Sequence, residues 1–125
     1  MKKNIYNSIK IFADGANFKE MVSLSKTSFI KGMTTNPSLM RKNKIKNYEI
    51  FAKKILKVIK NKPISFEVFS DNLEEMKLQA EIINSWGKNV YVKIPITNTK
   101  KKSTSRLIKY LSNKFRSIKL RDFFK

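Results

Sequence analysis

The sequence predicts an α/β fold in which parallel β-strands alternate with helices in about four βα units. Two observations carry this prediction. Short apolar runs of strand length alternate with longer segments whose apolar residues recur at helical spacing. Turn-forming and helix-capping residues stand between these segments. With 125 residues, of which 41% are hydrophobic, the chain is long enough for one hydrophobic core and short for two, so we expect a single folding unit.

The first half of the chain contains a strand, a helix, a strand and a helix at residues 11–13, 18–25, 28–33 and 48–59. The first strand leads into Asp14 and Gly15, a pair typical of turns. The second strand ends before Pro37, which favours an extended Asn36 and suits a loop or the start of a further helix. Apolar residues over 48–59 recur at helical spacing with lysines between them, and Pro63 stops any continuation.

In the second half we predict a strand over residues 64–69, a helix that ends at Gly87, a strand over 90–94 and a weaker helix over 104–111, with residues 118–124 as a candidate start of a fifth strand. The first of these helices has Asp71 or Asn72 as its cap and Glu74 and Glu75 in its first turn. We therefore divide the chain into residues 1–114, which carry the alternating pattern, and residues 115–125, a basic and divergent tail.

The net charge of +19, from 28 basic and 9 acidic residues, raises nucleic acid as a partner. The distribution of these charges argues against it. Lysines are scattered along every segment, without interleaved aromatic residues for base stacking and without a known nucleic-acid module. A lysine-rich solvated surface is the simpler interpretation. A polyanion-binding tail remains the alternative for the basic end of the chain.

The residue types that are missing narrow the chemistry further. The sequence has no cysteine and no histidine, so disulfides, thiolate catalysis and the commonest metal ligand are all excluded. We expect no metal and no diffusible cofactor. The sequence also has no apolar run of membrane-spanning length, and its start, MKKNIYNSIK, lacks the apolar core of a signal peptide. We therefore expect a cytoplasmic location and no membrane partner.

Four polar residues stand at or near the carboxyl ends of the first four predicted strands, namely Asp14, Asn36, Glu67 and Lys93. In parallel α/β folds these strand ends form the active site. A lysine within an apolar strand is costly unless it is paired or neutral, and a neutral amine can attack a carbonyl carbon. Two acids, an amide and an amine at one end of a sheet would suit imine chemistry.

Each of these residues also has a structural interpretation. Asp14 before Gly15 and Asn36 before Pro37 are common turn pairs. Lys93 on an edge strand would be able to extend its amine along the surface into water. Glu67, within an apolar strand, is harder to explain in this way. The residue pattern alone leaves the reaction class open.

Two motifs resemble the transaldolase family. The segment KGMTTNPSLM, residues 31–40, resembles the signature of that family around Thr-Thr-Asn-Pro-Ser, and NVYVKIPIT, residues 89–97, is similar to the stretch that holds its Schiff-base lysine. IFADGAN and ISFEVFSD are similar to its first and third strands. The resemblance covers about residues 10–111. It implies the N-terminal half of a (β/α) TIM barrel, with Glu67 where transaldolases have a glutamate and fructose-6-phosphate aldolases tend to have glutamine.

The resemblance also implies roles for individual residues. Lys93 would form the imine with a ketose phosphate, Glu67 would transfer protons through a water, and Asp14 would exchange a proton with the hydroxyl next to the cleaved bond. Asn36 would hold hydroxyls of the bound intermediate, and the substrate-binding residues would be Thr34, Thr35, Asn36 and Ser38. The implied reaction is transfer of a dihydroxyacetone unit between sugar phosphates, in carbohydrate metabolism and the pentose phosphate pathway.

Full members of the family close an eight-stranded barrel that usually takes about 200 or more residues. We therefore expect a C-terminally truncated chain that either self-associates through open sheet edges or folds poorly, with little turnover in either case. On the open face we expect apolar residues such as Phe12, Phe66 and Val92. Two alternatives stay open, namely aldolase-like cleavage of fructose 6-phosphate and a non-catalytic half-barrel that binds a partner or a polyanion.

Overall fold

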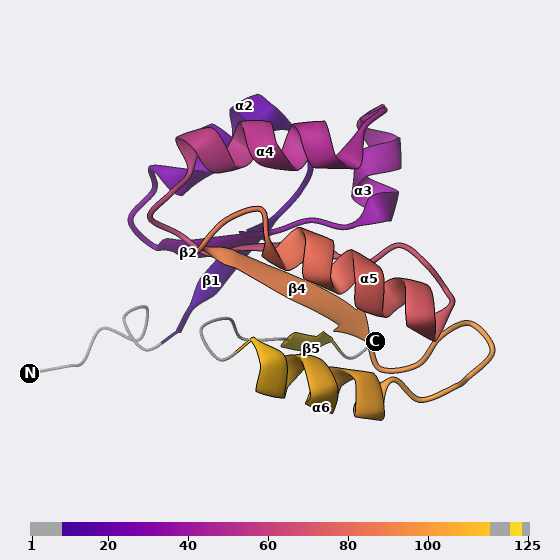
Figure 1. Cartoon of the computed structure of the whole chain (residues 1–125). Coiled ribbons are helices and arrows are strands. Elements are labelled where there is room, and N and C mark those ends of the chain that lie inside the picture. The colour runs from indigo at the N-terminus through magenta and orange to yellow at the C-terminus, as the bar shows by residue number, and fades with distance from the viewer. Residues whose placement is uncertain (1–8, 116–120, 124–125) are drawn as a thin grey trace, which may run out of the picture. The chain divides into compact units, whose positions relative to one another are not determined.

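A computed structural model describes residues 9–115 and 121–123 of the chain. These residues fall into two compact units, Met1–Ile64 and Ser65–Lys125, and each is described in turn. In both units parallel strands alternate with helices along the chain (Figure 1). The predicted fold class is thereby confirmed as α/β with parallel strands, consistent with part of a (β/α) barrel.

The first unit contains β1 (Ile11–Asp14), α2 (Phe18–Ser25), β2 (Ile30–Thr34), α3 (Pro37–Lys42) and α4 (Tyr48–Val58). Strands β1 and β2 pair in parallel, from Ile11 beside Ile30 to Asp14 beside Thr34. Helices α2 and α4 lie side by side, and α2 packs against β2 (Figure 1). Met21, Met33 and Ile55 are among the buried side chains of this unit.

Gly32 allows a close approach within the first unit. A Cβ atom at this position would lie 2.6 Å from the Phe12 ring and 2.9 Å from the carbonyl oxygen of Pro63. The next residue, Met33, donates its N–H to that same carbonyl oxygen at 2.9 Å. The absence of a side chain at Gly32 therefore lets β2, Phe12 and the segment before β3 pack together.

The second unit contains most of β3 (Ile64–Glu67), followed by α5 (Leu73–Asn84), β4 (Val90–Pro95), α6 (Ser105–Lys114) and β5 (Arg121–Phe123). The N–H of Val68 donates to the carbonyl oxygen of Lys93 at 3.1 Å, which ties the end of β3 to β4. Strand β4 pairs in parallel with β5, with Lys93 beside Arg121. Helix α5 packs against both β4 and α6 (Figure 1).

Side chains alternate between the two faces of β4. Val90, Val92 and Ile94 are fully buried, whereas Tyr91 on the other face is only half-buried. In β3, the fully buried Phe66 meets the Trp86 ring edge to face at a centroid distance of 5.6 Å. Phe66 and Val92 therefore belong to the packed core. The expectation that these two residues lie on an open face of the sheet was wrong. Neighbouring residues of a strand point to opposite faces, so Phe66 and Val92 lie on the face opposite to that of Glu67 and Lys93, and both are fully buried.

Asparagine side chains cap helices α2, α3, α4 and α5. The side-chain oxygens of Asn17, Asn36, Asn47 and Asn72 each accept the N–H of the residue three positions later. This bond satisfies one of the free donors at a helix start. Helix α5 is thus capped by Asn72, the second of its two predicted caps. Helix α6 differs, since its first flanking residue, Thr104, makes no such bond.

Several elements differ from their predicted bounds, among them β3, α6 and β5. Strand β3 ends at Glu67, before residue 69, because the N–H groups of Phe69 and Ser70 donate to Gln79 Oε1 at 2.9 and 3.0 Å. Helix α6 continues to Lys114, whose amine lies 2.8 Å from Glu81 of α5. Strand β5 occupies residues 121–123 of the predicted 118–124, and the rest of that segment lies outside the described residues.

Within the described part of the chain, no helix has both the length and the apolar character needed to cross a lipid bilayer.

Candidate functional site

Lys93 and Glu67 lie together in the second unit. The Lys93 Nζ atom is 3.9 Å from Glu67 Oε2, and their side chains are 10% and 24% exposed. Both residues stand at the carboxyl ends of their strands, Glu67 as the last residue of β3 and Lys93 two residues before the end of β4. The pair is thus an ion pair that is largely shielded from water, at a separation too long for a direct hydrogen bond.

The surroundings of Lys93 explain why a paired acid is needed. Its neighbours in β4, Val92 and Ile94, are fully buried on the opposite face, so the lysine is anchored in an apolar strand. Burying an ammonium group is costly unless an opposite charge accompanies it, and Glu67 supplies that charge. Chemically, a shielded primary amine beside a carboxylate can add to a carbonyl carbon while the carboxylate moves protons.

Asp14 and Thr34 form a second polar contact, in the first unit. Thr34 Oγ1 donates to Asp14 Oδ1 at 2.7 Å, and the two residues end the paired strands β1 and β2. The backbone N–H of Gly15 also donates to the carbonyl oxygen of Thr34 at 3.0 Å. Asp14 is exposed and therefore reachable from solvent. This contact brings together two residues that the sequence analysis named separately, as a catalytic acid and a substrate-binding residue.

The remaining predicted residues lie at the start of α3. Asn36 Oδ1 accepts the N–H of Leu39 at 2.9 Å, so its side-chain oxygen serves as the helix cap. Ser38 Oγ accepts a hydrogen bond from Arg41 at 3.2 Å. Thr35 is completely buried, and among the described residues none forms a hydrogen bond with its Oγ1. The cap gives Asn36 a structural role whether or not it also binds substrate.

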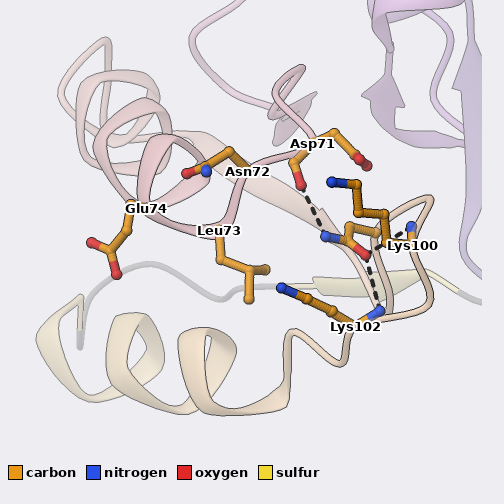
Figure 2. Close-up of a pocket in the computed structure, with 7 residues that line it drawn as sticks. Asp71, Asn72, Leu73, Glu74, Lys100 and Lys102 are labelled. Carbon is orange, nitrogen blue, oxygen red and sulfur yellow. Dashed lines mark hydrogen bonds between the residues drawn. The ribbon is translucent and has the colours of Figure 1, made fainter.

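The second unit contains a pocket that the sequence did not predict. Its volume is about 380 Å³, and it lies between the start of α5 and the loop that joins β4 to α6 (Figure 2). The lining residues are Asp71, Asn72, Leu73, Glu74, Asn98, Lys100 and Lys102. From the sequence, Asp71 was predicted only as a possible helix cap. No pattern in the sequence joins these two stretches.

The part of the chain that the structure describes contains no cluster of acidic side chains that would form a metal site. Within residues 9–115 and 121–123, no three Asp or Glu side chains lie close enough together to hold one.

Comparisons with known proteins bear on the chain as a whole. A family model described as transaldolase/fructose-6-phosphate aldolase matches residues 11–114. A probable transaldolase of Sulfurihydrogenibium sp. (strain YO3AOP1) is 38% identical over 106 residues, which cover 85% of this chain and 46% of that protein. A probable transaldolase of Dehalococcoides mccartyi is 36% identical over 89 residues, covering 71% of this chain and 41% of that protein.

A probable transaldolase of Thermoplasma acidophilum is 38% identical over 91 residues, covering 71% of this chain and 40% of that protein. The chain thus spans a little under half the length of these three relatives. The matched region includes the two motifs on which the resemblance rests, and it extends over most of the sequence. The chain therefore belongs to the transaldolase/fructose-6-phosphate aldolase family.

Proposed function

We propose that this chain transfers a dihydroxyacetone unit between sugar phosphates through an imine on Lys93. The observation that carries the proposal is the shielded Lys93 amine with the Glu67 carboxylate 3.9 Å away. Family membership supports the same chemistry, since the matched relatives are described as probable transaldolases. A glutamate at position 67 favours transaldolase over aldolase, because by the resemblance fructose-6-phosphate aldolases tend to have glutamine there.

In the proposed reaction Lys93 first gives up a proton, through a water, to Glu67, and its amine then adds to the carbonyl carbon of a ketose phosphate. The resulting carbinolamine loses water to give the imine, and Glu67 transfers the protons through a water. Cleavage of the carbon–carbon bond moves its electron pair towards the imine nitrogen and leaves an enamine. The neighbouring hydroxyl loses its proton and becomes the aldehyde of the departing aldose phosphate. A second aldose then reverses these steps, and hydrolysis of the final imine releases the product.

The other predicted residues take supporting roles in this proposal. Asp14 accepts the hydroxyl proton in the cleavage step, and the hydrogen bond from Thr34 orients its carboxylate. Asn36 holds substrate hydroxyls while its oxygen caps α3. Thr35 and Ser38 remain proposed substrate-binding residues.

Trapping with borohydride tests the imine. We expect the folded protein, incubated with fructose 6-phosphate and reduced, to carry one adduct, which peptide mapping by mass spectrometry assigns to Lys93. The Lys93→Met variant should carry none. Lys53→Met is the matched control, because Lys53 also pairs with a glutamate, Glu49, but on the exposed surface of α4. An unlabelled wild-type protein, or equal labelling of Lys93→Met, would refute the proposal.

The acceptor distinguishes transfer from simple cleavage. With fructose 6-phosphate and erythrose 4-phosphate together, a transaldolase forms a seven-carbon ketose phosphate, whereas an aldolase releases free dihydroxyacetone. We expect the seven-carbon product to exceed free dihydroxyacetone. A protein that forms no adduct but binds heparin in a salt-dependent manner would instead fit the non-catalytic, polyanion-binding alternative.

A further inference from the structure

Asp71 joins the two loops that follow β3 and β4. Its Oδ1 atom accepts the N–H of Thr99 at 2.7 Å, and its Oδ2 atom accepts the Thr99 hydroxyl at 2.5 Å. Its backbone oxygen accepts a further bond from Asn98 Nδ2 at 3.1 Å (Figure 2). These three bonds, which we call the Asp71 clamp, link residues that are 27 or 28 positions apart in the sequence.

The segment between Glu67 and Asp71 is held along its length. Val68 bonds to the backbone of Lys93, and Phe69 and Ser70 both donate their N–H groups to Gln79 of α5. The Ser70 hydroxyl also donates to Glu75 Oε2 at 2.5 Å. Glu67 and Asp71 are therefore joined by a short segment with little freedom to move.

Hydrogen bonds also hold the loop between β4 and α6 in place. The Thr104 hydroxyl contacts the carbonyl oxygens of Pro95 and Ile96 at 2.5 and 2.8 Å, which closes the base of the loop. Nearer its tip, Asn98 Oδ1 accepts the N–H groups of Lys100 and Lys102 at 3.0 and 2.9 Å (Figure 2). Thr99, which donates two hydrogen bonds to Asp71, thus belongs to a compact loop that follows Pro95, the last residue of β4 and the second after Lys93.

From these contacts we infer that Asp71 is a positioning residue for the imine chemistry, because its clamp fixes the spacing between Glu67 and Lys93. This inference rests on the proposed function. Glu67 and Lys93 each lie before a loop that hydrogen bonds hold in place. The clamp links these two loops beyond the ends of β3 and β4. A displacement of about 1 Å at a reacting pair can cost about 100-fold in rate, so a fixed spacing has chemical value.

A carboxylate suits this position better than an amide. Thr99 presents two donors, and each oxygen of Asp71 accepts one of them. An asparagine has one acceptor oxygen and would turn its NH₂ group towards the second donor. The bonds from Thr99 and the charge of Lys100 lower the pKa of Asp71, which keeps the acceptor ionised at neutral pH. Glu74 and Lys102 are the other charged groups that line the same pocket.

The test compares four variants by borohydride trapping with fructose 6-phosphate, in which the rate constant and the final yield of adduct are measured separately. We expect Asp71→Asn and Thr99→Val to lower the rate constant at saturating sugar about tenfold. Their final yields should equal the wild-type yield, because the folded protein still reacts. Thr99→Ser keeps both donors and should react within about twofold of wild type. Glu74→Gln, which removes a different carboxylate from the pocket, should do the same.

The possible results distinguish a failure of the positioning role of Asp71 from a failure of the proposed reaction. A wild-type protein without an adduct overturns the proposed function, and this inference falls with it. A wild-type adduct together with unchanged rate constants in Asp71→Asn and Thr99→Val overturns the inference alone. A lower final yield with an unchanged rate constant means that the clamp only stabilises the fold, which also overturns it. Because Thr99→Val is a near-isosteric change, loss of folding in Asp71→Asn would still leave a decisive variant.

Discussion

At the scale of single residues, Asp71 has a pKa below its ordinary value of 3.8, chiefly because the Thr99 side chain and backbone donate hydrogen bonds to the carboxylate. A carboxylate with a lowered pKa in the folded state contributes stability that is present above its unfolded pKa. That contribution is lost as the pH falls through the folded pKa. The Asp71 clamp should therefore stabilise the protein at neutral pH and cease to do so in acid.

Thr99→Val tests this pH dependence. We expect the variant to unfold at a lower urea concentration than wild type at about pH 6, with the difference shrinking below about pH 3.8 as Asp71 is protonated in both proteins. The remaining carboxylates titrate in both proteins and cancel in the comparison. A difference that stays constant or grows in acid would contradict the expected sign.

Gly15, in the loop after β1, and Gly32, within β2, give a second residue-scale prediction. Gly32→Ala places a methyl group 2.6 Å from the Phe12 ring and 2.9 Å from the Pro63 carbonyl oxygen, and the latter is backbone that cannot rotate away. We expect a loss of about 1 to 3 kcal/mol in the free energy of unfolding, measured in urea. Gly15→Ala is the control, since its Cβ would meet nothing within 4 Å. Equal stability of the two variants would refute this packing role.

At the scale of elements, the apolar spacing of residues 48–59 predicted the start of α4 at Tyr48, because helical periodicity is a property of neighbouring residues. The structure adds the cap Asn47, whose side-chain oxygen accepts the N–H of Ile50 at 2.9 Å. The end of β3 was predicted less well. It depends on Gln79, which takes the N–H groups of Phe69 and Ser70 from a position nine or ten residues away.

Replacing the cap of α4 measures this local contribution. Asn47→Ala should lower the free energy of unfolding by about 1 kcal/mol, because the first turn loses an acceptor. Asn47→Ser keeps an acceptor oxygen and should retain most of that stability. Urea unfolding followed by circular dichroism gives both values. If serine costs as much as alanine, the side-chain bond is not the source of the effect.

At the scale of the whole molecule, the net charge of +19 makes self-repulsion the leading electrostatic effect. Salt screens such repulsion, with a Debye length of about 10 Å at 0.1 M. We therefore expect the urea midpoint to rise between about 0.02 M and about 0.5 M NaCl, a comparison that works because urea itself is uncharged. A midpoint that falls with salt would show that attractive ion pairs, such as Lys114 with Glu81, outweigh the repulsion.

Self-association through a sheet edge stays a prediction. The same charge opposes contact between two copies, so added salt should increase any self-association. Sedimentation velocity at low micromolar concentration and at both salt concentrations measures it. A single monomeric species at both would contradict the expectation.

The sequence by itself determined the α/β class, the order of the elements and the family, because periodicity, caps and motifs are properties of neighbouring residues. It also marked Glu67 and Lys93 as charged residues that an apolar strand would not otherwise contain. Only the tertiary structure decided that these two lie 3.9 Å apart, that Asp71 grips Thr99, and that Phe66 and Val92 face the core. The physical reason is that such contacts join residues more than 25 positions apart, or depend on which face a strand buries, and both are fixed only when the strands pair and pack against the helices.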